Sequence, residues 1–399
     1  MSTTHRHLHR LAWLAVALAL GVIVFGAFVR LSNAGLSCPD WPTCYGRASW
    51  PTHAHEIAAA NAQFERPVEV HKAWREQTHR MLAGGLGVLV VLLALLATRR
   101  RRDGIASILA AAVLIALSIP LYMRALYPWA GALAITGELL LLTSAARWSG
   151  DQARVATLAL AMIMFQALLG MWTVTWLLKP VVVMGHLLGG LTTFALLTWL
   201  AWRSMPDGML TLAGAFRLRV LLWIGLGLLA AQIALGGWTS ANYAAWSCGT
   251  DFPKCLDQWW PAMDFKQAFV LARGVGVDYE GGVLDGPARV AIQMTHRLFA
   301  LLVFGHLLGV GIRLLRTPGM RSWALTLLVL VCVQVALGIS NVLFALPLPI
   351  AVLHNAGAAL LLFVLVSLLA RLREPGELQA LPELPNVPKL EDVPQRESA

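Results

Sequence analysis

The strongest constraint on this chain is a series of apolar runs, each about as long as a membrane is thick. A helix needs roughly 20 apolar residues to cross the hydrocarbon layer. Ten such runs lie near residues 11–30, 79–98, 105–123, 128–146, 154–176, 182–202, 219–238, 288–312, 323–344 and 349–371. With 58% hydrophobic and 13% charged residues, the chain is too apolar for a soluble domain of this length. The sequence predicts an all-α integral membrane protein with about ten transmembrane helices.

The basic residues predict the orientation of these helices. If the N-terminus is cytoplasmic, every arginine cluster falls on the cytoplasmic side, as the positive-inside rule requires. The clusters are Arg6/Arg10, 99–102, Arg147/Arg154, Arg203/Arg217/Arg219, Arg313/Arg316/Arg321 and Arg371/Arg373. The long connections 31–78 and 239–287 then face outward, and the segment 374–399 is a disordered cytoplasmic tail. Because the charge of +10 is spread between apolar runs, it does not predict nucleic-acid binding.

Four of the five cysteines lie in the two outer connections as close pairs, Cys38 with Cys44 and Cys248 with Cys255. An oxidising compartment on the outer side favours a disulfide within each pair. A zinc site is the alternative, but neither pair has the two-residue spacing of a metal knuckle. Cys332 lies within an apolar run and is predicted to be a packing residue.

The chain contains an internal repeat. Gly26–Cys38 resembles Gly237–Cys248, and both segments end an apolar run and open a long connection. Three further matches follow in the same order, namely Glu76–Arg80 with Gln293–Arg297, Phe165–Gly170 with Val333–Gly338, and His186 with His354. Two halves of four helices each are therefore predicted, residues 1–102 with 151–204 and residues 205–373, related by a pseudo-twofold axis along the membrane normal.

The repeat also locates an insertion. His79 and His186 are 107 residues apart, whereas His296 and His354 are 58 apart, so the first half is 49 residues longer. The segment 103–150 accounts for the difference and is predicted to be an inserted transmembrane hairpin. An even number of added helices leaves the orientation of everything downstream unchanged.

Only four of the eleven histidines, His79, His186, His296 and His354, recur in both halves. We expect them about one turn inside the outer face, where an ionisable side chain is costly and usually functional. Two imidazoles approaching from opposite sides are typical ligands of a haem iron. His306 is unmatched and is predicted to form an interhelical hydrogen bond. Small residues that would let a porphyrin lie close follow the four histidines, namely Ala83, Gly189, Gly190, Ala300, Gly357 and Ala358.

Charged residues near these histidines differ between the halves. Arg80 and Arg297 each follow a histidine and are candidates to pair with haem propionates. Glu76 lies three residues before His79, whereas the equivalent residue of the second half is the neutral Gln293. A carboxylate beside one haem predicts proton handling there. The alternative is that Glu76 caps its helix or pairs with Arg80.

At these residues the chain strongly resembles haem A synthase of proteobacteria. The motifs that carry the resemblance are Gly35–Cys44, His71–Arg80, Gly185–Gly190, Gly237–Asn242 and the histidines of the second half. The resemblance covers nearly the whole chain outside 103–150 and the tail. Because family members usually have eight helices, the inserted hairpin is a departure from the family.

The resemblance implies a membrane haem-dependent oxidoreductase. Haem O, the substrate, would lie between His79 and His186 with Glu76 as the catalytic carboxylate, and His296 and His354 would ligate a resident haem b. Successive hydroxylations would oxidise the C8 methyl group to a formyl group, giving haem A for cytochrome oxidase. The resemblance also implies that the first cysteine pair is tied to activity.

The implied location is the bacterial inner membrane, with both termini cytoplasmic and the cysteine-bearing loops periplasmic. Expected partners are haem O, membrane lipid, haem O synthase and an unidentified electron acceptor or donor, and self-association is left open. Two other functions compete. A di-haem b-type cytochrome would only transfer electrons, and a haem transporter or chaperone would release an unchanged haem.

Overall fold

The computed structural model describes residues 3–148, 150–205 and 207–375. Within them, ten helices are long and apolar enough to cross a membrane, which confirms the all-α membrane fold. They are α1 (Thr3–Leu31), α3 (Val70–Thr98), α4 (Gly104–Met123), α5 (Tyr127–Arg147), α6 (Asp151–Thr175), α7 (Pro180–Arg203), α8 (Ala215–Ala241), α10 (Gly286–Leu315), α11 (Arg321–Leu343) and α12 (Leu348–Arg371). Most of the expected disordered tail, 376–399, lies outside the described residues.

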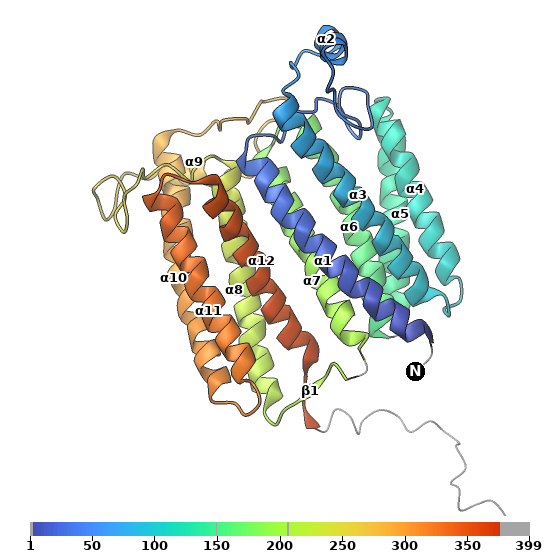
Figure 1. The fold of residues 1–399 in the computed structure, drawn as a ribbon, viewed down its shortest axis with the longest axis vertical. Helices are drawn as coiled ribbons and strands as arrows, with labels where there is room; N and C mark the ends of the chain where they lie inside the picture. The colour runs from blue at the N-terminus through green and yellow to red at the C-terminus, as the bar shows by residue number, and fades with distance from the viewer. Residues whose placement is uncertain (1–2, 149, 206, 376–399) are drawn as a thin grey trace, which may run out of the picture.

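The long helices run side by side, and the two long connections emerge at one end of the molecule (Figure 1). These connections carry the short helices α2 (Ala54–Gln63) and α9 (Phe265–Ala268) and all four loop cysteines. We call this end the disulfide face. The N-terminal end of α1 lies at the other end, which we call the opposite face.

The helices form two rings of four. In the first ring α1 contacts α3 and α7, and α6 contacts the same two helices. In the second ring α8 and α11 each contact both α10 and α12. The rings meet where α12 packs on α1 and α7, and where α7 packs on α8. Helices α4 and α5 pack on each other and against α6, at the edge of the first ring, as the predicted hairpin requires (Figure 1).

The four repeated histidines lie deeper than one turn from the helix starts. His186 and His354 are each six residues after the first residue of their helix, His79 is nine residues after it, and His296 is ten. At 1.5 Å per residue these positions are roughly 9–15 Å along the helix. The helices begin before the apolar runs, with polar or proline-containing first turns, so distance from the helix start differs from depth in the membrane. The expected depth of one turn below the outer face stays a prediction.

Two short strands join the halves at the opposite face. Strand β1 (Leu210–Thr211) lies in the connection between the halves, and β2 (Leu372–Arg373) follows α12. They pair in parallel, with Leu210 opposite Leu372. The buried core extends from here between the rings and includes Leu197, Leu200, Leu365 and Leu368.

Candidate functional site

Each of the four repeated histidines packs against a glycine on a neighbouring helix. The pairs are His79 with Gly26 of α1, His186 with Gly170 of α6, His296 with Gly236 of α8, and His354 with Gly338 of α11. A methyl group added to these glycines would stand 2.7, 3.4, 3.1 and 3.1 Å, respectively, from Cε1 of the facing imidazole. The missing side chain therefore sets how far each ring can approach the neighbouring helix.

The histidines of each half come from helices that are diagonally opposite in their ring. His79 on α3 and His186 on α7 lie within electrostatic range of each other, and so do His296 on α10 and His354 on α12. In each ring the other two helices separate this diagonal pair. A ligand between the two imidazoles would thus occupy the centre of a four-helix bundle, where bundles commonly bind cofactors.

The chemistry of the imidazoles fits a haem. Nδ1 atoms of His79, His186 and His354 are buried without a hydrogen-bond partner, although buried polar atoms are normally paired. Among the described residues there is no cluster of three or more His, Cys, Asp or Glu side chains that would ligate a bare metal ion. Two imidazoles suffice for an iron that is already bound by the four nitrogens of a porphyrin.

Two of the small residues after the histidines have a different role from the one we expected. A methyl group on Gly189 would overlap the amide of Gln166, and one on Gly357 would overlap the amide of Gln334. These glycines make room for glutamine side chains from the preceding helix, so the expectation that they face a porphyrin is wrong. Gly190 has only an ordinary contact with Gln166, at 3.9 Å.

The two histidine pairs differ in their hydrogen bonds. In the second half the Gln232 amide nitrogen lies 3.1 Å from Nδ1 of His296 and donates to the His296 carbonyl oxygen at 3.1 Å. The Gln334 amide nitrogen donates to the His354 carbonyl oxygen at 3.0 Å and lies 3.4 Å from its Nε2. In the first half the equivalent Gln166 amide nitrogen is buried without a partner. Glutamine side chains therefore form hydrogen bonds to the histidines of the second pair and not to those of the first.

Glu76 is 5% exposed and binds the first disulfide loop. Its Oε2 accepts hydrogen bonds from the Cys38 backbone N–H at 2.8 Å and from the Ser37 hydroxyl at 3.0 Å. Its Oε1 forms an ion pair with Arg80 at 2.6 Å. The pairing with Arg80 that we considered from the sequence is therefore present. Gln293, the equivalent residue, is also buried, but its side-chain oxygen has no hydrogen-bond partner.

Arg80 and Arg297 differ in how many N–H groups remain available. Arg80 donates to three backbone carbonyl oxygens of the disulfide loop in its own half, and Arg297 donates to two. Arg80 also donates to Glu76, whereas Nε and Nη2 of Arg297 are buried without a partner. Only Arg297 therefore keeps two unpaired N–H-bearing nitrogens for an anionic group.

Two further arginines near the first histidine pair were missed from the sequence. Arg30 is four residues after Gly26 and Arg75 is four residues before His79, so each lies one turn nearer the disulfide face on the same side of its helix. Nε of both arginines is buried without a partner. Arg30 also donates to the Ser240 carbonyl oxygen at 2.7 Å.

Both arginines belong to the first half only. The internal repeat of the sequence shows this difference between the halves. Because Gly26 and Gly236 contact equivalent histidines, the correct register pairs Gly26 with Gly236 instead of Gly237. In this register Ser240 is equivalent to Arg30. In either register Arg30 is equivalent to a small residue, Ser240 or Ala241, so the sequence already contained this difference between the halves.

One known protein family matches most of this chain. The family model described as cytochrome oxidase assembly protein, COX15-CtaA, matches residues 9–120 and 124–366. The chain belongs to this family. Because the matched range runs through most of 103–150, the expectation that this segment lies outside the resemblance is wrong.

Three similar proteins of this family are each named heme A synthase. The protein from Shewanella oneidensis is 37% identical over 364 residues, which cover 90% of this chain and 96% of the relative. The protein from Caulobacter vibrioides is 27% identical and covers 91% of this chain and 96% of the relative. The protein from Granulibacter bethesdensis is 25% identical, with 90% and 85% covered.

In this member of the family the two disulfide loops are built alike. Cys38 is bonded to Cys44 and Cys248 to Cys255, as predicted. The second cysteine of each loop forms an isolated β-bridge with the residue three positions later in the chain. In the first loop burial raises the pKa of Tyr45 to about 12, so its hydroxyl stays protonated and donates to the Pro67 carbonyl oxygen at 3.0 Å.

His306 and Cys332 lie outside the loops, in membrane-spanning helices. His306 Nε2 lies 3.0 Å from the Leu221 carbonyl oxygen on α8, which confirms the predicted interhelical hydrogen bond. Cys332 is a free, exposed residue of α11, so the prediction that it packs in the interior is wrong. A position on the outer surface of a membrane helix is as apolar as a core position, and the sequence pattern does not separate the two.

Proposed function

We propose that this chain is a haem A synthase, which oxidises the C8 methyl group of haem O to a formyl group and so supplies haem A to cytochrome oxidase. The main support is the presence of two diagonal histidine pairs, only one of which receives hydrogen bonds from glutamines, in a member of the cytochrome oxidase assembly family. The reaction is balanced by water. One methyl group and one water molecule give one formyl group, four protons and four electrons.

The first half is the proposed substrate site. His79 and His186 would ligate the iron of haem O, and the lack of glutamine hydrogen bonds suits a ligand that must enter and leave. Arg30 and Arg75 would pair with its propionates, because their unpaired Nε atoms lie one turn nearer the water. The farnesyl tail of haem O would remain in the apolar part of the membrane.

The second half is the proposed site of a resident haem b. Gln232 and Gln334 donate to the backbone carbonyl oxygens of His296 and His354 and so fix the helix turns that carry these histidines, and such supporting contacts increase the affinity of a metal site. The free N–H groups of Arg297 would pair with a propionate. When bound, haem b supplies one-electron redox chemistry, so the four electrons would pass in single steps to an acceptor outside the chain.

Glu76 is the proposed catalytic carboxylate. A carboxylate beside the substrate can accept protons from the attacking water and from the methyl carbon. The N–H of Cys38 and the guanidinium of Arg80 fix both of its oxygens. The first disulfide loop therefore positions Glu76 in this proposal, which gives the Cys38–Cys44 bond a structural link to activity.

The proposed location is the inner membrane of a bacterium, with the disulfide face toward the periplasm and both termini in the cytoplasm. The arginine distribution supports this orientation, and the oxidising periplasm would preserve both disulfides. Haem O synthase would supply the substrate in the same membrane.

The test is pigment analysis of membranes that contain the full chain together with a haem O synthase. We expect haem A with the wild-type chain. The variant Glu76→Gln copies the second half and should lower haem A formation by roughly 100-fold or more while the total haem content stays unchanged. The matched control, Gln293→Glu, should remain active. Full activity of Glu76→Gln would refute the catalytic role of this carboxylate.

The same experiment separates the competing functions. A wild-type chain that contains haem b and yields no haem A would overturn the enzyme proposal in favour of a di-haem cytochrome. Release of unchanged haem O to an added acceptor protein, again without haem A, would favour a haem transporter or chaperone.

A further inference from the structure

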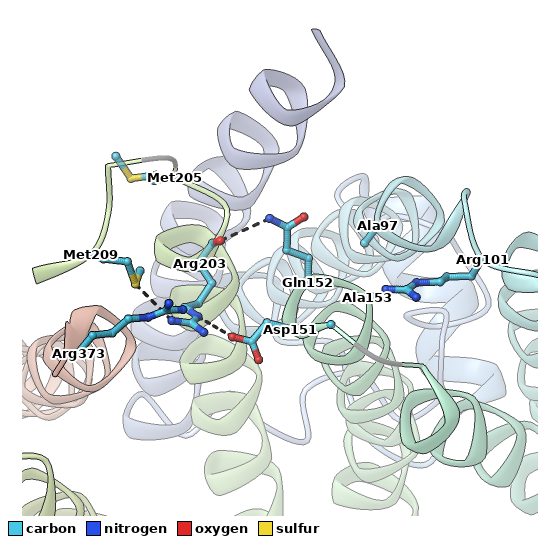
Figure 2. Close-up of a pocket in the computed structure, with 10 residues that line it drawn as sticks. Ala97, Arg101, Asp151, Gln152, Ala153, Arg203, Met205, Met209 and Arg373 are labelled. Atoms are coloured by element: carbon cyan, nitrogen blue, oxygen red, sulfur yellow. Dashed lines mark hydrogen bonds and ion pairs between the residues drawn. The ribbon is translucent and has the colours of Figure 1, made fainter. Parts of the chain in front are cut away.

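Two adjoining cavities lie at the opposite face, far from the histidines. The larger measures about 370 Å³ and is lined by side chains from α3, α6, α7 and β2 and from the segments beside them (Figure 2). The smaller measures about 260 Å³ and shares Arg203 and Arg373 with the larger one. Together the cavities are lined by four arginines and one carboxylate, namely Arg101, Arg203, Arg219, Arg373 and Asp151. Arg203 and Arg373 line both cavities, and their charge favours an anionic ligand.

We propose that these cavities bind the phosphate headgroup of an anionic phospholipid. The arginines come from the ends of helices and from β2, and such ends lie at the level of the lipid headgroups. A guanidinium binds a phosphate through paired hydrogen bonds, and basic pockets between transmembrane helices are known to bind anionic headgroups.

The lining of the smaller cavity favours a lipid over a free phosphate ion. Besides its arginines it is formed by Trp199, Leu369 and Leu372, which are apolar. A ligand that fills both cavities therefore needs a charged group and an apolar group side by side. A phospholipid provides both, with its phosphate against the arginines and the start of an acyl chain against the apolar side.

Arg373 carries most of the argument because its charge is not neutralised by a neighbour. Arg203 is already paired with Asp151 at 2.5 Å and also contacts the Met209 sulfur at 3.3 Å (Figure 2). Within the described part of the chain, the guanidinium of Arg373 has no hydrogen-bond or ion-pair partner. Its backbone pairs with β1, so the side chain can be changed without removing the strand pairing.

A lipid bound here would tie the two halves together. Arg203 ends α7 of the first half, whereas Arg373 follows α12 of the second half. The β1–β2 pairing that joins the same segments contains only two residue pairs. A phosphate bonded to both arginines would add a second connection between the halves, and the thermal stability of the protein should then increase with anionic lipid.

The test measures lipid binding to the purified full-length protein in neutral detergent, by native mass spectrometry and by thermal unfolding. The ligands are phosphatidylglycerol, phosphatidylcholine and inorganic phosphate. We expect phosphatidylglycerol alone to bind and to raise Tm. Arg373→Gln should weaken that binding roughly five- to tenfold. Arg316→Gln is the matched control, because Arg316 is an exposed arginine on the same face between α10 and α11.

Several outcomes would overturn the proposal. Equal binding of phosphatidylglycerol by both variants would show that Arg373 takes no part. Equal binding of phosphatidylcholine would show that headgroup charge does not matter. Binding of inorganic phosphate without lipid would make this a site for a soluble anion. If Arg373→Gln unfolds, Arg219→Gln tests the smaller cavity independently, and unchanged affinity in that variant would refute the proposal.

Discussion

Replacing Gly26 with alanine should remove haem ligation from the first half and leave the second half intact. The added methyl group would stand 2.7 Å from Cε1 of His79, whereas ordinary van der Waals contact begins at 3.4 Å. The imidazole must therefore move by about 0.7 Å. Metal–ligand distances in functional sites vary by only about 0.2 Å, so a displacement of this size breaks the bond to iron.

The substitution should not prevent folding. Gly26 lies within α1, and alanine is more favourable than glycine in a helix interior by about 1 kcal/mol. Gly170→Ala is the matched control, because its methyl group would stand 3.4 Å from Cε1 of His186, an ordinary contact. Both variants should reach the membrane in normal amounts.

The assay is haem titration of the purified protein, followed by visible and electron paramagnetic resonance spectra. The wild-type chain and Gly170→Ala should bind two haems with the low-spin signature of bis-histidine iron. Gly26→Ala should bind one. The reasoning would be refuted by a Gly26→Ala protein that binds two haems with unchanged spectra, because the Gly26 contact would then place no limit on His79.

Three further predictions test other contacts. Gln232→Val should lower the haem affinity of the second half roughly 10- to 100-fold, measured by haem transfer to an apo-globin. Gly189→Ala should cost about 1–3 kcal/mol in stability through overpacking, whereas Gly190→Ala should be neutral in the same thermal unfolding assay. Hydrogen bonds from backbone N–H groups lower the pKa of Glu56 to about 2, from an ordinary value of 4.5. The stabilisation of α2 by Glu56 should thus be complete above pH 4.5 and disappear as the pH falls toward 2. Hydrogen exchange of α2 should show this loss in the wild-type chain and no such change in Glu56→Gln.

The features that the sequence predicted correctly depend on local patterns or on the repeat. The ten helices follow from run length and hydrophobicity, because a membrane leaves few alternatives to a helix. The disulfides follow from cysteine spacing and compartment. The proximity of His79 and His186 follows from the comparison of the two copies, because residues that recur at equivalent positions are the best candidates for a shared role. Their role as haem ligands stays a prediction.

The features that were missed depend on contacts between helices. Gly189 and Gly357 looked like space for a flat ligand, but the space is filled by glutamines of the preceding helix. The hydrogen bond from Cys38 to Glu76 joins residues 38 positions apart in the chain. Neither contact has a local signal, because hydrophobic periodicity shows which residues are apolar and says nothing about which side chain enters which gap.

The two halves share the features that place the histidines and differ in the residues that surround them. All four histidines pack on a glycine in the same way, so an iron would meet similar ligand geometry in both halves. The differences lie in hydrogen-bonding and charged groups: Gln232 supports only His296, Glu76 is replaced by Gln293, and Arg30 is replaced by Ser240. If one half binds a resident haem and the other a substrate, the residues at these positions must determine which haem each half binds. The histidine ligands are the same in both halves, so only the residues that support them can tune the two sites differently.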